Sequence, residues 1–343
     1  MAQEQKTRKI DELIKVAKHY TLCNNYLNML DYCSHMRYLS PYNAMLAWTQ
    51  NPNASLLLSA PDWYFHGCTL KESARSVVIF MPFCPGELLF DQSNVEILNP
   101  PLIGDNQDYF EHIRSQILPP LYGDNVTIWN NLSTNINLDG ISVDLYYDNR
   151  PEYNVIRTVG QDSKQKVYIS IQGSAKPVEF PAFYYLQIGN PGWVEENGTP
   201  GADNRLEIII NQLAQLYCHH LPAPDGKEWN QRRLSQTAAE FESMSVLKLV
   251  LDHFGLMPPN DYFNTYAASN TYIPKSVSID TIMSAAGRII QLATNRRLPF
   301  QNGLLYRLNK DFQSKITRIK NKKRRAAAAA ATLPDYPIIP GFE

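Results

Sequence analysis

The residues of this 343-residue chain whose types and spacing suggest chemistry lie in the segment 211–215. In a helix, Asn211 and Gln215 share one face, which is the spacing at which two histidines bind zinc while a glutamate after the first activates water. Carboxamides are neutral and poor zinc donors, and Gln212 cannot accept a proton at the general-base position. We therefore expect no peptidase chemistry here and no metal cofactor.

Two carboxylates lie further along the chain, at Glu240 and Glu242, and either could serve as a third metal ligand. One carboxylate alone cannot hold zinc against water. A relocated site of His219, Cys218 and a distant glutamate is the alternative, although adjacent helical residues point about 100 degrees apart. The simpler interpretation is that Cys218 is buried and His220 is a satisfied polar residue near the helix end.

Charge is distributed unevenly along the chain. The formal net charge is -1, yet residues 288–325 contain twelve Lys or Arg and a single acid, Asp311. That stretch carries +11, which leaves -12 for the remainder. A cationic arm on an acidic body favours a polyanionic partner, either nucleic acid or a membrane surface. A solvated helix face that binds nothing is the alternative.

Composition limits the compartment and the size of the fold. No window approaches the roughly 18 to 20 apolar residues that a membrane-spanning helix needs, so we expect no membrane insertion. The five cysteines are scattered and form no C-x-x-C pair, and the first residues contain no apolar signal region. We therefore expect a reducing, cytoplasmic environment. The length and the 44% hydrophobic content allow two modest domains or one large one.

Apolar periodicity predicts the main elements. Helical spacing indicates helices over residues 9–33, 42–50, 206–221, 236–254 and 278–294, and a basic amphipathic helix from residue 304. Apolar runs predict a buried strand at 76–83 with a partner at 87–90, and shorter strands at 126–129, 141–147, 153–158 and 166–171.

The N-terminal part resembles the single-stranded-DNA-binding domain of ArdC-type antirestriction proteins. The resemblance rests on the helix in 38–54, on Asp62-Trp63, and on the basic turn 71–76 before the apolar strand. Within that turn, serines stand at two positions where the family has glycine. The resemblance implies binding of single-stranded DNA by this module.

A second segment, residues 206–256 with an extension to about 294, resembles the peptidase-like domain of the ImmA/IrrE type. Residues 211–221 keep the Leu-Ala, Leu-Tyr-Cys and His-Leu of the family's H-E-L-A-H-L-Y-C-G-H-L helix but lack its metal-binding groups. Glu240 and Glu242 resemble the E-x-E helix that supplies the third ligand. Together the two resemblances cover about half of the chain and imply an inactive, zincin-like scaffold.

Binding of a nucleic-acid single strand needs aromatic rings for stacking and cations for the phosphate backbone. The N-terminal module offers several rings, including Tyr38, Tyr64 and Phe65, although any tryptophan there could instead belong to the core. The residues that we expect to contact nucleic acid are Arg37, Tyr42, Asn43, Trp48, Trp63, Lys71, Arg75, Arg318, Lys322, Lys323, Arg324 and Arg325.

The sequence therefore predicts an α+β fold with two domains, the first a helical module with a β-hairpin or small sheet and the second zincin-like with a degenerate active-site helix. The expected divisions are residues 1–97, 98–300, a basic helix at 301–325 and a flexible tail at 326–343. The predicted function is non-catalytic binding of nucleic acid, single-stranded DNA in the first place. The resemblance adds a mobile-element or anti-defence context. The alternatives are a divergent metal-dependent peptidase with relocated ligands, and a scaffold that holds a protein partner in the inert cleft.

Overall fold

The computed structural model shows a mixed α+β fold with small sheets. Side chains at 84, 85, 320, 322, 323 and 326–331 lie outside the description, as do residues 9–11 and 13–19 of the helix that we predicted over residues 9–33. The structure describes residues 12, 20–81, 84–98, 105–118, 125–146, 154–160, 164–170, 177–189, 205–257 and 261–331.

The N-terminal elements are helices around a short antiparallel sheet of order β1-β4-β3, beside a β2-β5 pair. They are α2 (Cys23–His35), α3 (Pro41–Gln50), β1 (Leu57–Ser59), α4 (Ala60–Phe65), β2 (Cys68–Leu70), β3 (Ser76–Met81), β4 (Cys84–Asp91), η1 (Gln92–Asn94), β5 (Val95–Ile97) and α5 (Asn106–Ile117).

The remaining elements include a second small sheet of order β6-β10-β7, in which β10 pairs parallel with β6 and antiparallel with β7. They are α6 (Asn125–Asn135), η2 (Ile136–Asp139), β6 (Ile141–Tyr146), β7 (Val155–Thr158), β8 (Lys166–Ile169), β9 (Val178–Pro181), β10 (Tyr184–Gly189), α7 (Arg205–Tyr217), α8 (Gln236–His253), α9 (Asp261–Ser269), α10 (Ile279–Thr294), η4 (Phe300–Asn302), α11 (Leu304–Leu308) and α12 (Lys310–Ala331).

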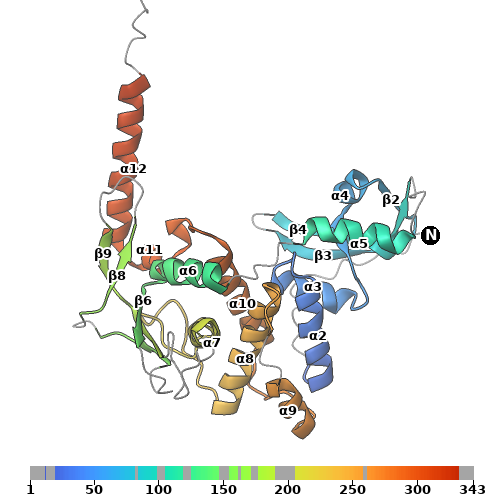
Figure 1. Ribbon diagram of the computed structural model, residues 1–343, viewed down its shortest axis with the longest axis horizontal. Helices are drawn as coiled ribbons and strands as arrows, with labels where there is room; N and C mark the ends of the chain where they lie inside the picture. The colour runs from blue at the N-terminus through green and yellow to red at the C-terminus, as the bar shows by residue number, and fades with distance from the viewer. Residues whose placement is uncertain are drawn as a thin grey trace, which may run out of the picture.

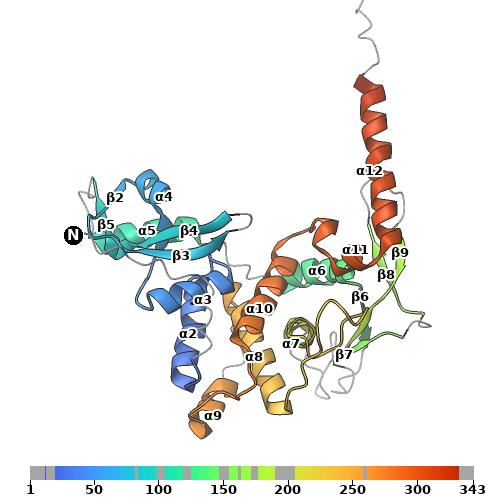
Figure 2. The same ribbon diagram turned by 180° about the vertical axis from the view of Figure 1, so that it is seen from behind.

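Helices α8 and α10 lie between the two groups of elements (Figures 1 and 2). The larger apolar core runs from α2 and α3 through α8 and α10 to the base of α12. Within it, the fully buried ring of Tyr26 lies 5.3 Å from the ring of Phe241, and its hydroxyl donates to Ser245. A smaller core around Trp63 and Ile113 joins α4 and α5 to the first sheet.

The outer edge of β3 is covered by side-chain amides from α3. The Asn43 amide donates to the carbonyl of Phe80 and accepts from its N–H, both at 3.0 Å. About two turns further along α3, the Gln50 amide donates to the carbonyl of Val78 at 2.8 Å and accepts from its N–H at 3.0 Å. Because an open strand edge exposes unpaired backbone groups, these two amides take the place of a neighbouring strand.

A buried carboxylate, Asp139, fixes the elements that precede α12. It accepts hydrogen bonds from the Arg288 guanidinium at 2.7 and 2.8 Å, from the Tyr217 hydroxyl at 2.6 Å and from the backbone N–H of Leu304 at 2.8 Å. These contacts join η2 to α7, α10 and α11. They hold the start of the C-terminal helices against the core.

Several predicted elements are confirmed, including the helices at 236–254 and 278–294. The strand predicted at 126–129 is wrong, because these residues begin α6. Ile128 and Leu132, four residues apart, face α10 and are buried. Residues 126–129 taken alone form a short apolar run that predicts a strand. The helical spacing becomes visible only when Leu132 is included.

The basic segment forms two helices that meet at Asn309, whose side chain accepts from the N–H of Phe312 at 3.0 Å and so caps α12. Residues 326–331, which we predicted to begin a flexible tail, continue α12 as helix. Alanine has the highest helix propensity, so the alanine run extends the helix. No helix in the described residues has the length and apolarity needed to cross a membrane.

Candidate functional site

The three carboxamides of α7 point to different neighbours. Gln212 is buried, and its Oε1 accepts a hydrogen bond from the backbone N–H of Ile156 on β7 at 3.0 Å. The Asn211 amide lies 3.9 Å from the sulfur of Met244 on α8, and Gln215 is partly buried. Gln212 therefore joins α7 to the sheet, and no hydrogen bond among the described residues links the three carboxamides to each other.

The two downstream glutamates have opposite environments. Glu240 is exposed, whereas Glu242 is fully buried. Arg232 donates to Oε1 and Oε2 of Glu242, each at 2.7 Å, and the N–H of Ser278 donates to Oε1 at 2.7 Å. His220 Nε2 lies 2.8 Å from Oε2. Both oxygens of the Glu242 carboxylate therefore accept two hydrogen bonds each.

Electrostatics agree with an ionised Glu242. Burial alone raises the pKa of this carboxyl, but the hydrogen bonds from His220, Arg232 and the Ser278 N–H outweigh it and hold the pKa below its ordinary value. Since the carboxylate has no hydrogen of its own, Nε2 of His220 carries the hydrogen between them. The cluster is a buried ion pair with matched donors.

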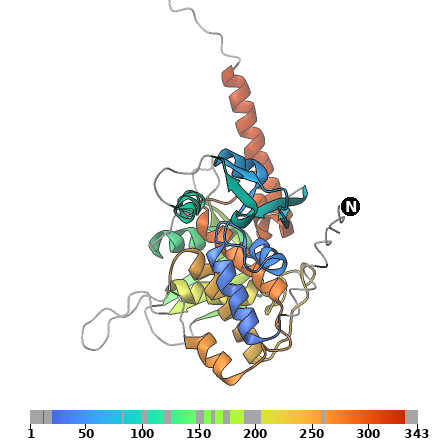
Figure 3. The same cartoon turned by 90° about the vertical axis from the view of Figure 1, so that its right-hand side faces the viewer.

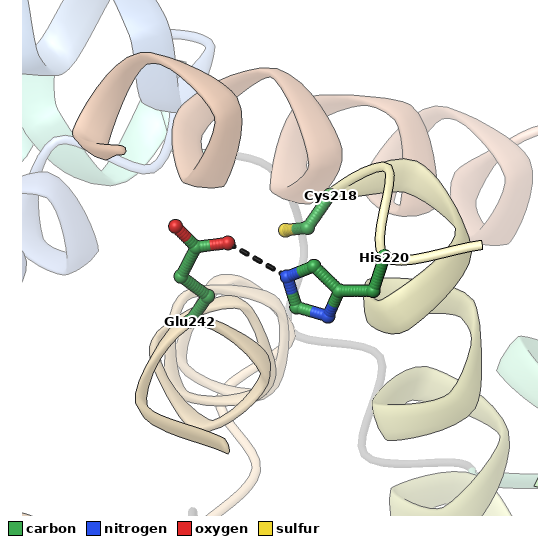
Figure 4. A group of neighbouring side chains, drawn as sticks. All are labelled: Cys218, His220 and Glu242. Atoms are coloured by element: carbon green, nitrogen blue, oxygen red, sulfur yellow. Dashed lines mark hydrogen bonds and ion pairs between the residues drawn. The ribbon is translucent and has the colours of Figure 1, made fainter. Parts of the chain in front are cut away.

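Cys218, His220 and Glu242 place their ligand atoms within 4.8 Å of one another, which raises the question of a metal site (Figure 4). In this arrangement the carboxylate and Nε2 of His220 are occupied, while Nδ1 of His220 is buried with no hydrogen-bond partner among the described residues. Arg232 already supplies a positive charge at the carboxylate, and His220 Nε2 has no lone pair to offer while it donates to Glu242. Burial and then the charge of Glu242 raise the pKa of the Cys218 thiol, which favours its protonated form in this metal-free arrangement.

The structure also corrects the relocated set of ligands that the sequence suggested. Helix α7 ends at Tyr217, four residues before the predicted end, because His219 adopts a left-handed conformation with φ of 63°. This turn brings His220, and not His219, beside Cys218. The His219 ring stacks instead on Trp229, with centroids 5.1 Å apart. Cys218 is buried, as predicted.

Arg232, which was not among the residues predicted from the sequence, connects this cluster to three segments. Besides Glu242 on α8, it donates to the carbonyl of Cys218 at 3.2 Å and to that of Ser276 at 2.9 Å. Its position 10 residues before Glu242 follows no motif. The only sequence signal is that a buried glutamate needs a cation, and the sequence does not show which one.

Three of the residues predicted to contact nucleic acid have structural roles instead. Trp63 has no exposed surface and donates through Nε1 to the carbonyl of Phe90 at 2.7 Å, so its ring cannot stack on a base. The Tyr42 hydroxyl donates to Asp280 at 2.6 Å. Asn43 is occupied at the edge of β3. Trp63 is therefore removed from any binding face, whereas Tyr42 and Asn43 make these structural contacts while remaining partly exposed.

Two more of the predicted residues lie partly inside the fold. The Trp48 ring packs 5.2 Å from the ring of Tyr32. Arg37 is half-buried, and desolvation lowers its pKa. Its charge also contributes to the low pKa of the neighbouring His253. Neither side chain is placed as an open contact for a ligand.

The exposed groups of the N-terminal part are different ones. The rings of Tyr64 and Phe65, at the end of α4, are 73% and 85% exposed. Lys71 and Arg75 are exposed as predicted, although Lys71 Nζ donates to the carbonyl of Ser93 at 2.9 Å. Adjacent exposed rings with cations in the same module are the features that stack and neutralise a single strand.

Helix α12 is strongly basic. Its 22 residues contain eight Lys or Arg and one acid, Asp311. Arg318, Arg324 and Arg325 are exposed, and none forms an ion pair with another described residue. The side chains of the predicted contacts Lys322 and Lys323 lie outside the described residues. Figures 1 and 3 show α12 rising from β8 and β9 and projecting away from the body.

Comparison of the chain with protein-family models, with curated proteins and with solved structures finds no match. The function is therefore argued from the arrangement of the residues. Two features remain available for binding: the projecting basic helix and the exposed rings of α4.

Proposed function

We propose that this protein binds nucleic acid, that α12 is its principal phosphate contact, and that it does not hydrolyse peptides. The projecting positive charge of α12 is the observation that carries the proposal. The helix is about 33 Å long at 1.5 Å per residue, so its cations can follow several successive phosphates. The exposed arginines of α12, Arg318, Arg324 and Arg325, have no ion-pair partner among the described residues that would give them a role inside the fold.

The apolar content of α12 favours nucleic acid over a membrane surface. Phe312 and Ile316 are buried in the core at the base of the helix. Beyond Ile319 the helix contains only Lys, Arg, Asn and Ala. A helix that lies in a bilayer interface needs large apolar side chains opposite its cations. The exposed part of α12 lacks them, whereas phosphate contacts require only the charge.

Single-stranded nucleic acid is the form that the other exposed features favour. Tyr64 and Phe65 offer stacking faces that a duplex, with its bases paired and stacked, cannot use. The resemblance of residues 38–76 to ArdC-type modules points the same way. We propose single-stranded DNA as the ligand class.

The lack of peptidase activity follows from the chemistry at the resembling positions. Gln212 occupies the place of the general base, and its carboxamide oxygen is held by the Ile156 N–H. Asn211 and Gln215 offer neutral amides where imidazoles would bind zinc. In this proposal the α7–α8 pair serves only to support the fold, in a zincin-like arrangement that binds no metal.

The test is a fluorescence-anisotropy titration of a labelled 20-nucleotide single strand and of the matched duplex at low salt. We define the arm variant by three substitutions of exposed arginines in α12: Arg318→Gln, Arg324→Gln and Arg325→Gln. We expect its affinity to be lower than that of the wild type by roughly 10-fold or more. Each phosphate contact that is lost also removes the favourable release of a counterion from the strand.

A charge-matched control separates a local contact from an effect of net charge. We define the control variant by three substitutions of exposed cations on the body: Lys227→Gln, Arg233→Gln and Lys275→Gln. It should bind like the wild type. Absence of wild-type binding to either form would overturn the proposal, and equal losses in the arm and control variants would remove α12 from it.

A further inference from the structure

A pocket opens beside the base of α12, between η2, β8 and the segment that leads into η4. Its volume is about 440 Å³. Its lining includes Leu138, Tyr168, Ser170, Arg297 and Phe300. No contact described for the candidate site above uses this pocket.

The lining combines the groups that recognise a nucleotide. Leu138 and Leu298 are buried and form an apolar floor. The Tyr168 ring is 55% exposed at the wall, with Phe300 as a second ring. Arg297 is an exposed cation at the same pocket. Planar bases bind between apolar or aromatic walls, while a cation beside them contacts the phosphate.

Hydrogen bonds from the side chain of Asn135 hold the segment that carries Arg297 in place. Asn135 is buried and donates to the carbonyls of Leu292 and Asn295, at 2.8 and 2.6 Å. Its Oδ1 accepts from the N–H of Leu298 at 3.2 Å. All three bonds end on the backbone around Arg297, so this wall of the pocket is formed before a ligand arrives. A preformed wall lowers the ordering cost of binding.

The other side of the pocket depends on a close approach that only glycine permits. A Cβ atom at Gly303 would lie 2.4 Å from the carbonyl oxygen of Leu138. Leu138 lines the pocket floor, so Gly303 lets the chain that enters α11 pack directly on it. The pocket is thus built by tight backbone packing.

One residue of the pocket wall, Phe300, packs against the base of the basic helix. The Phe300 ring lies 5.9 Å from the ring of Phe312 at the base of α12, and Phe312 lies 4.7 Å from Phe180 on β9. Nζ of Lys315 lies 4.8 Å from the centre of the Phe180 ring. The base of α12 is therefore anchored next to the wall of the pocket that Phe300 forms.

We propose that this pocket holds one unstacked base of the single strand whose phosphates α12 contacts. The inference rests on the proposed function, since it needs a bound strand. It assigns Tyr168 and Phe300 as stacking rings and Arg297 as the contact to the adjoining phosphate. The ligand class is thereby a single strand, because a base inside a duplex cannot enter.

The experiment compares a labelled 12-nucleotide thymidine strand with a strand of the same length and charge whose central residues are abasic. We expect Tyr168→Ala to weaken binding of the thymidine strand roughly 5- to 100-fold, which is the range for loss of a base–aromatic stack. It should leave binding of the abasic strand unchanged. Tyr168→Phe should bind like the wild type, because the ring remains.

Matched controls are available on the same chain. Tyr272 is 61% exposed, and its substitution Tyr272→Ala should change nothing. Arg297→Ala should weaken binding of both strands, whereas Arg233→Ala, which removes the same charge from an exposed site, should not. Thermal unfolding verifies that each variant is folded. We expect every variant to fold, because the substituted side chains are exposed.

The outcomes separate this inference from the proposed function. If the wild type binds and the arm variant does not, but Tyr168→Ala behaves like Tyr272→Ala, the pocket assignment is overturned and the proposed function stands. An equal loss on both strands in Tyr168→Ala also overturns it, because no base would then be involved. If the wild type binds neither strand, the proposed function fails and the pocket assignment fails with it.

Discussion

Substitution of Arg232 by alanine tests the interpretation of the buried Glu242 cluster as an ion pair that stabilises the fold. The change removes both guanidinium hydrogen bonds of 2.7 Å and leaves the carboxylate with Ser278 and His220 alone. Removing one partner of a buried pair typically costs about 3 to 5 kcal/mol. Because the Arg232 side chain is 21% exposed, we expect the lower end, about 3 kcal/mol.

The assay is urea unfolding followed by circular dichroism at pH 7, with Arg233→Ala as the control. Arg233 is exposed, so its substitution should change the free energy of unfolding by less than about 0.5 kcal/mol. A double-mutant cycle with Glu242→Gln should give a coupling energy above about 1 kcal/mol between Arg232 and Glu242. A variant Arg232→Ala that is as stable as Arg233→Ala would refute the argument.

The pH dependence gives a second readout of the same pair. The folded-state pKa of Glu242 is lowered, so its stabilisation is present above the unfolded pKa of about 4.3 and is lost as pH falls through the folded pKa. In Arg232→Ala the main positive partner is gone, and the pKa of Glu242 rises. The variant should therefore unfold at a higher pH than the wild type during acid titration.

Three further predictions concern the fold. Gln212→Ala leaves the β7 amide unpaired and should lower the free energy of unfolding by about 1 to 3 kcal/mol in urea titrations, with Gln215→Ala as the milder control. Asn43→Ala should cost less, about 0.5 to 1.5 kcal/mol, because its two hydrogen bonds to Phe80 lie at an exposed strand edge where water can replace them. Burial and then the charge of Arg37 lower the pKa of His253 to about 4. Stability should fall as pH decreases from about 6.5 to 4, since the unfolded histidine binds the proton first, and His253→Phe should flatten that part of the pH profile.

The sequence predicts the helices well where apolar spacing is regular. The helix expected at 236–254 appears as Gln236–His253, because its apolar residues pack on α2, α7 and α10 and its cap residue Ser235 accepts from the N–H of Ala238. The end of α7 could not be predicted in the same way. It depends on a left-handed His219, and histidine is not a residue that signals a helix end as glycine does.

The candidate site shows why residue type alone does not assign a role. Trp63 and Phe65 lie two positions apart in one short helix, yet one has no exposed surface and the other is 85% exposed. Only the packing of α5 on that face decides which ring is covered. Arg232 is a further example, because its partner Glu242 is set by the fold and no motif connects the two residues.

The central claim is that the projecting cations of α12 contact nucleic-acid phosphates, and the salt dependence of binding tests it most directly. For the wild type, the logarithm of the association constant for a single strand should fall linearly with the logarithm of salt concentration. Loss of three phosphate contacts in the arm variant should make that slope shallower by about 2, since each contact contributes roughly 0.7 for single strands. The control variant should keep the wild-type slope. A wild-type slope near zero, or one unchanged in the arm variant, would contradict the account.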